Sequence, residues 1–158
     1  LLVGFYEELL LRGYYLTNFS QGFRSFLTPE GSIWLALILS SGIFSVAHIF
    51  NPGSTVMSSI NIFLVGVILL GSGFVLTGSL AIPIGVHISW NYFQGAVFGF
   101  PVSGTGLNTV SFITIEQHGS VLLTGGQFGP EAKRVLAILK SQVDASPRQR
   151  APNVVRVQ

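Results

Sequence analysis

The feature that most constrains this chain is a long stretch without charge: no Asp, Glu, Lys or Arg occurs between Gly31 and Ile115. Over the whole sequence 9% of residues are charged and 49% are hydrophobic, whereas soluble domains carry roughly 25% charged residues. A surface this apolar is poorly solvated by water, and a backbone in lipid must satisfy its own hydrogen bonds. The sequence therefore predicts an all-α, polytopic transmembrane helix bundle in a lipid bilayer.

The apolar runs indicate about four core helices, expected at residues 1–16, 33–50, 55–77 and 80–100. Residues 17–31 are expected to form a polar connection between the first two helices. Within it, Thr28 is a suitable N-cap and Pro29 a suitable first helical residue. The dipeptide Gly78-Ser79 is so short a connection that the helices on either side of it must be antiparallel neighbours.

From Pro101 the sequence becomes rich in Gly, Ser and Thr, which is typical of irregular backbone, here expected at the membrane surface. Residues 130–143 predict a short amphipathic helix, and residues 144–158 a polar, disordered tail. We therefore expect a membrane-embedded core over residues 1–143. The basic residues that follow the last apolar run place this end of the chain in the cytoplasm by the positive-inside rule; they are Lys133, Arg134, Lys140, Arg148, Arg150 and Arg156.

Composition excludes several classes of site. The chain has no cysteine, so disulfides, thiolate nucleophiles and thiolate metal sites are ruled out. The net charge of +2 comes mostly from the basic tail, and no nucleic-acid partner is expected.

Six residues with ionisable or strongly polar side chains stand out among the polar residues inside the apolar runs: Glu7, Glu8, Arg12, His48, His87 and Asn91. A charge at the bilayer centre costs about 2.5–3.5 kcal/mol on insertion scales, and such groups usually pair with one another and serve a function. Glu8 can pair with Arg12 at i, i+4, while Glu7 points about 100° away around the helix. Three helices thus each offer a polar face, and we expect these faces to meet in one cavity.

Such a cavity could hydrolyse a peptide bond. A carboxylate and a histidine can hold and deprotonate a water, and a second histidine with an asparagine can stabilise the oxyanion that forms on the attacked carbonyl. The alternative is structural: a buried Glu–Arg pair that joins helices, and histidines that only pack. A non-catalytic immunity or partner-binding protein with a polar intramembrane pocket is the competing function.

Other intramembrane hydrolases fit the sequence less well. A zinc protease of the H-E-x-x-H type needs two histidines four residues apart around a glutamate, and neither His48 nor His87 has that setting. An aspartyl protease needs two membrane aspartates, but the only aspartate is Asp144, in the tail. A serine protease would show a G-x-S-G motif within a span, and none is present.

The order Glu-Glu-x-x-x-Arg, Phe-x-x-x-His and His-x-x-x-Asn on successive helices resembles the CPBP family of intramembrane endopeptidases, which are CAAX-prenyl-protease-like and bacteriocin-processing proteins, also called the Abi family. The matching segments run from Glu7 to Arg12, Phe44 to His48 and His87 to Asn91. The resemblance covers about residues 1–130. It also implies helices upstream of residue 1 that this sequence does not contain.

By this resemblance, Glu7 would activate the water with His48 as its partner, His87 and Asn91 would form the oxyanion hole, and Glu8 with Arg12 would support them. The family was long described as metal-dependent, but a glutamate–water mechanism without a metal also fits it. Because Asn91 suits an oxyanion hole better than a metal shell, we expect a glutamic endopeptidase without a cofactor; the alternative is a zinc ion held by Glu7, His48 and His87. The substrate would be a prenylated CAAX peptide, a leader peptide or another membrane protein. The expected location is the plasma membrane, as a multi-pass protein.

Overall fold

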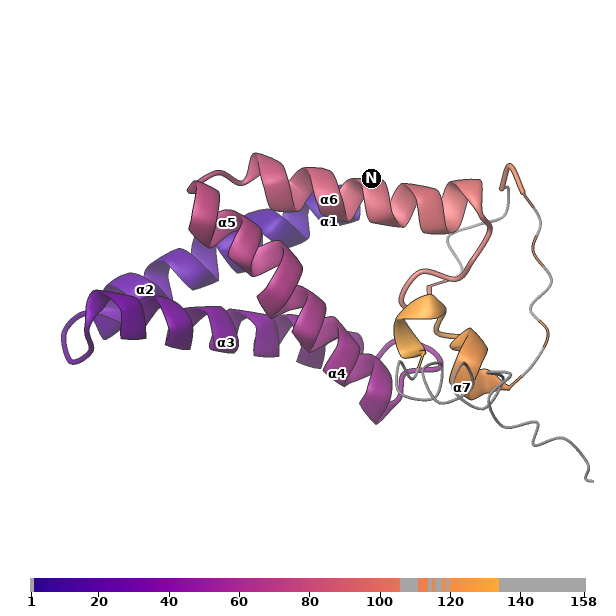
Figure 1. Ribbon diagram of the computed structural model, residues 1–158, viewed down its shortest axis with the longest axis horizontal. Coiled ribbons are helices and arrows are strands. Elements are labelled where there is room, and N and C mark those ends of the chain that lie inside the picture. The colour runs from indigo at the N-terminus through magenta and orange to yellow at the C-terminus, as the bar shows by residue number, and fades with distance from the viewer. Residues whose placement is uncertain (1, 106–110, 114, 116–117, 119, 134–158) are drawn as a thin grey trace, which may run out of the picture.

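The computed structural model describes residues 2–105, 111–113, 115, 118 and 120–133 (Figure 1). Its first helix runs through α1 (Leu2–Glu8), the wider-wound η1 (Leu9–Leu16) and α2 (Thr17–Phe23) without a break. The polar connection expected from residue 17 is therefore wrong as far as Phe23. The hydroxyls of Thr17 and Ser20 bond to main-chain carbonyls of the same helix, so these polar residues are accommodated without ending it.

The helix α3 (Pro29–His48) begins as predicted. Thr28 is its N-cap, with the side-chain oxygen accepting a hydrogen bond from the Gly31 amide at 3.2 Å, and Pro29 opens the first turn. The buried face of α3 consists mainly of small side chains, namely Ser32, Ala36, Ser40, Ser41 and Ser45, with Leu37 and Phe44. Small residues let neighbouring helices approach closely, which places α3 in the middle of the bundle.

The next helix runs through α4 (Val56–Val65), η2 (Gly66–Gly71) and α5 (Ser72–Thr77), and it starts at a capping box formed by Thr55 and Ser58. Gly78 ends it in the left-handed conformation at φ 67°, which a glycine adopts without steric cost. The chain then returns through α6 (Ala81–Asn91) and η3 (Tyr92–Val97). As predicted from the short connection, α5 and α6 are neighbours, but they cross obliquely instead of lying antiparallel (Figure 1).

The helices pack so that α1 lies along α6, while α3 contacts η1 and α2 on one side and α4 and η2 on the other (Figure 1). Among the described residues there is no strand beyond one isolated bridge, between Val102 and Thr105. The all-α helix bundle is thus confirmed.

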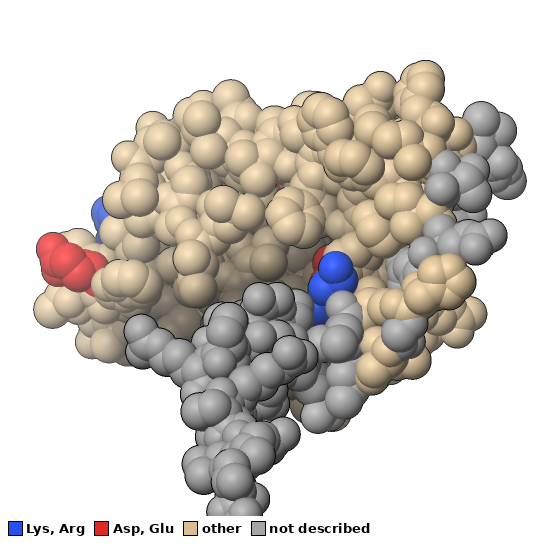
Figure 2. Space-filling model, turned by 45° about the vertical axis from the view of Figure 1, so that its right-hand side comes forward, with Lys and Arg blue, Asp and Glu red and all other residues tan. Residues whose placement is uncertain are grey.

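The bundle presents an apolar exterior. Pro29–His48 and Val56–Thr77 are each long and apolar enough to cross a membrane. Large exposed hydrophobic side chains occur along the long helices, and few charged side chains are visible on the face in Figure 2. These features, with the composition, indicate a protein whose helices lie in lipid.

The part after Pro101 is irregular where it is described, apart from the short α7 (Val121–Thr124) and a turn of 3₁₀ helix, η4 (Pro130–Ala132). The amphipathic helix predicted from residue 130 is wrong at its start, because Lys133 is already extended. The Asn61 side chain donates hydrogen bonds to the carbonyls of Glu131 and Lys133, at 2.7 and 2.9 Å, and so ties this segment to α4. Residues 134–143 and the predicted tail, 144–158, lie outside the described residues.

Candidate active site

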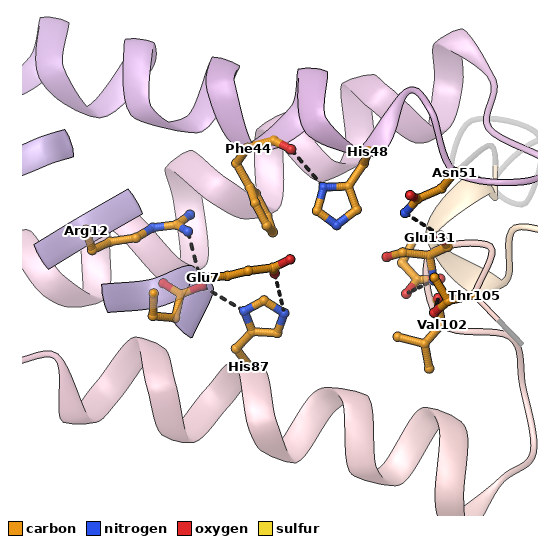
Figure 3. A network of polar contacts seen from close by, with 11 residues as sticks. Glu7, Arg12, Phe44, His48, Asn51, His87, Val102, Thr105 and Glu131 are labelled. Atoms are coloured by element: carbon orange, nitrogen blue, oxygen red, sulfur yellow. Dashed lines mark hydrogen bonds and ion pairs between the residues drawn. The ribbon is translucent and has the colours of Figure 1, made fainter. Parts of the chain in front are cut away.

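The polar faces of the helices meet at one cavity of about 260 Å³. Glu7 reaches it from α1, His48 from α3, and His87 and Asn91 from α6. Figure 3 shows the Glu7 carboxylate between the two imidazole rings. The structure therefore brings together all four residues for which the sequence suggested direct roles in chemistry.

Glu8 and Arg12 lie behind this cavity and are fully buried. Arg12 Nη1 donates to Glu8 Oε1 at 3.1 Å, which is the pairing expected from their i, i+4 spacing. Arg12 Nη2 donates to the Gly66 carbonyl at 3.1 Å, and the guanidinium lies 5.0 Å from the centroid of the Phe44 ring. The pair thus links the first helix to η2 and α3.

His87 lies between the two glutamates. Its Nδ1 is 2.7 Å from Glu8 Oε1, a hydrogen bond, and its Nε2 is 3.6 Å from Glu7 Oε2, which is an ion-pair distance. Gly4, one turn before Glu8, lets α1 approach α6 here, since a Cβ on it would lie 3.2 Å from His87 Cγ and 3.1 Å from the Ile88 amide nitrogen. The contact from Glu8 to His87 was not predicted from the sequence.

His48 is oriented by its own helix. Its Nδ1 lies 2.7 Å from the Phe44 carbonyl oxygen. A carbonyl can only accept, so Nδ1 carries a proton, and in the neutral tautomer this leaves the lone pair on Nε2. The Phe44 ring meets the His48 and His87 rings edge-on, with centroids 4.6 and 5.9 Å apart. Phe44 therefore positions both histidines.

The opposite end of the cavity is also polar, which the helical spacings in the sequence did not indicate. Asn51, Ser103 and Glu131 line it, and Glu131 lies beyond His48 in Figure 3. Burial raises the pKa of the Glu131 carboxyl above its ordinary value of 4.5, while hydrogen bonds from Gln94 and the Ser103 amide act in the other direction. These residues stand in the loop after α3 and in the irregular C-terminal part, where no helical spacing could reveal them.

The zinc alternative can be tested on the arrangement of donors. Glu7, His48 and His87 are suitable ligand types, and each histidine has its Nδ1 held, as in many zinc sites. Over the described residues, however, no three or more His, Asp or Glu side chains are grouped so that they could hold a metal ion. The residues as placed do not fit a zinc ion.

Comparison with known protein families gives a match over the first part of the chain. The family model described as type II CAAX prenyl endopeptidase Rce1-like matches residues 1–93. This range contains Glu7, Glu8, Arg12, His48, His87 and Asn91. No curated protein and no solved structure shows a significant match to the chain.

Proposed function

The chain belongs to the family of Rce1-like type II CAAX prenyl endopeptidases, and on this premise we propose that it cleaves a peptide bond beside the membrane with a water activated by Glu7 and His48. The family and the two apolar helices indicate an integral membrane protein with protease activity. The observation that carries the proposal is the convergence of Glu7, His48, His87 and Asn91 on one cavity.

In the proposed reaction a water sits between the Glu7 carboxylate and Nε2 of His48. Glu7 takes a proton from this water as its oxygen attacks the carbonyl carbon of the scissile bond. When the carbon–nitrogen bond breaks, Glu7 returns the proton to the leaving amine. The hydrogen bond from His48 Nδ1 to the Phe44 carbonyl supports this role, because it keeps Nε2 available as an acceptor.

His87 and Asn91 are proposed to stabilise the oxyanion. For His87 to donate from Nε2 while its Nδ1 bonds to Glu8, both ring nitrogens must carry protons. Glu7, Glu8, Arg12 and His87 then hold two negative and two positive charges. A neutral cluster suits a site of low dielectric, where an uncompensated charge is costly.

We propose a lipid-modified CAAX-type peptide as the substrate. An apolar groove of about 750 Å³ runs along α6 and η3, and Val86 and Trp90 line both this groove and the cavity. The groove could hold an apolar chain while the attached peptide enters the cavity. A multi-pass arrangement in the plasma membrane, with the basic C-terminal residues in the cytoplasm, completes the proposal.

The test is cleavage of a farnesylated, fluorescently labelled CAAX peptide by the full chain in liposomes. The parent protein should release the labelled fragment. Glu7→Gln should lower the turnover at least about 100-fold, since it removes the base, yet still bind the peptide. Glu30→Gln is the matched control, because Glu30 is an exposed glutamate at the start of α3.

Two results would contradict the proposal. Undiminished cleavage by Glu7→Gln would remove Glu7 from the mechanism. Binding of the peptide by the parent protein without any cleavage would instead favour the competing function, a non-catalytic partner-binding protein.

A further inference from the structure

The Glu131 carboxylate is a polar group of the cavity that the proposed hydrolysis does not use. Its Oε1 accepts a hydrogen bond from Gln94 Nε2 at 2.7 Å and one from the Ser103 amide at 3.3 Å. Gln94 Nε2 also donates to the Pro101 carbonyl at 2.7 Å. One oxygen of Glu131 is thus held in place by the surrounding chain.

The other oxygen, Oε2, is buried and has no hydrogen-bond partner among the described residues, while the Trp90 side chain lies close enough to lower the pKa of the Glu131 carboxyl. Leaving a buried acceptor unpaired is costly, more so for a charged group. Gly129 contributes to this arrangement, because a Cβ at that position would lie 2.8 Å from Oε2 and 2.2 Å from the Pro101 carbonyl oxygen. The Gly129 main chain therefore packs closely against one side of this oxygen.

The position of Glu131 indicates which group could donate a hydrogen bond to Oε2. It lines the same cavity as Glu7, His48, His87 and Asn91, and it lies across the cavity from Glu7 (Figure 3). Residue 131 is outside the range that matches the family, residues 1–93. The described structure pairs Glu131 with no Lys or Arg side chain.

We propose that Glu131 Oε2 accepts a hydrogen bond from a main-chain amide N–H of the substrate peptide, and so holds the peptide across the cavity with its scissile carbonyl at Glu7. This inference rests on the proposed function. In its carboxylate form Glu131 can only accept hydrogen bonds, and the donors on Oε1 leave Oε2 as the oxygen that remains to be paired. Every peptide substrate offers an amide N–H, whereas a cationic side chain occurs only in some.

The variant Glu131→Gln tests this role. Its amide oxygen can keep the contacts with Gln94 and Ser103, but its NH₂ group then faces the substrate where Oε2 stood. The side-chain N–H of the variant and the main-chain N–H of the substrate are both donors, so no hydrogen bond can form between them. We expect the KM for the farnesylated CAAX peptide to rise about 10- to 100-fold, the range for a lost hydrogen bond to a charged group, with little change in kcat.

Binding to uncleaving protein separates this inference from the proposed hydrolysis. In the Glu7→Gln background, the affinity for the labelled peptide is measured with each amide near the scissile bond replaced in turn by an ester, which lacks the N–H. One ester should weaken binding to Glu7→Gln and have no further effect in the double variant Glu7→Gln, Glu131→Gln. Glu30→Gln again provides the matched control.

The inference is overturned if Glu131→Gln binds the all-amide peptide as tightly as the parent background, or if every ester effect persists unchanged in the double variant. A purely structural role for Glu131 would leave every ester effect unchanged in the double variant. Because binding is measured without turnover, the result holds whether or not the parent protein cleaves this peptide.

Discussion

At the scale of single residues, the two adjacent glutamates make different contacts and therefore have different roles in the proposed site. Glu7 lines the cavity, whereas Glu8 has no exposed surface and bonds to both Arg12 and His87. Glu8 thus holds the His87 ring in orientation and neutralises the guanidinium. The sequence spacing indicated only the Arg12 half of this role.

Glu8→Gln should therefore lower cleavage, but less than Glu7→Gln. The amide can still bond to Arg12 or His87, yet the buried guanidinium loses its counter-charge. Groups that orient a histidine by bonding to its other ring nitrogen typically contribute about 10- to 100-fold to activity. We expect the turnover of Glu8→Gln to fall by a factor in that range. Turnover of the labelled peptide by both variants, measured side by side, checks the order; a Glu8 variant as inactive as the Glu7 variant would contradict it.

Side chains alone activate the water in the proposed mechanism, so activity should survive prolonged treatment with a strong chelator. Elemental analysis of the active protein should show far less than one zinc per chain. The measurement is turnover before and after chelation, with a known zinc protease treated in parallel. Loss of activity that stoichiometric zinc restores would overturn the metal-free assignment and make Glu7, His48 and His87 ligands.

At the scale of elements, small residues decide how closely the helices pack. A Cβ on Gly66 would lie 3.0 Å from Ser41 Cβ and 3.3 Å from Arg12 Nη2. The Gly66 carbonyl is also an acceptor for Arg12. The contact of η2 with α3 therefore sets the position of the guanidinium, and through it that of Glu8.

Gly66→Ala should destabilise the bundle by about 1–3 kcal/mol, the usual cost of an overpacked contact, and should lower turnover because Arg12 is displaced. Gly42→Ala is the matched control: it stands within α3 with nothing within 4 Å of the added Cβ. This control should be neutral or stabilising by up to about 1 kcal/mol. Unfolding in detergent measures both; equal stability of the two variants would contradict the close approach.

At the scale of the whole molecule, the irregular C-terminal part closes the cavity end opposite Arg12. Asn61 ties it to α4, Asn51 donates to the Ser103 carbonyl at 2.8 Å, and Gln94 joins η3 to Pro101 and Glu131. These contacts bring a carboxyl group into a largely apolar setting. Part of the stability of the fold must therefore depend on pH.

The raised pKa of Glu131 sets the sign of this dependence. Below pH 4.5 the carboxyl is protonated in both the folded and the unfolded chain and costs nothing. As the pH rises from 4.5 through the folded-state pKa, the unfolded chain releases the proton first, so the free energy of unfolding falls. Glu131→Gln should remove this fall and be the more stable form at neutral pH. Thermal unfolding of both proteins across this range measures it; parallel pH profiles would contradict the assignment.

Most of the confirmed predictions depend on residues that lie near one another in the chain. The uncharged run from Gly31 to Ile115 determined the helix bundle, because lipid leaves few other choices. The Thr28-Pro29 start and the Gly78 end depend on local backbone geometry, and they are confirmed. The family resemblance, carried by short spacings within single helices, is confirmed as well.

Contacts between distant segments were decided only by the tertiary structure. The bond from His87 to Glu8, the approach of Gly4 to α6 and the position of Glu131 join parts of the chain that no helical period relates. The start of the helix predicted from residue 130 is wrong for the same reason, since Asn61 of α4 binds the Glu131 and Lys133 carbonyls. Local sequence sets which faces are polar, whereas packing in three dimensions sets which polar atoms meet.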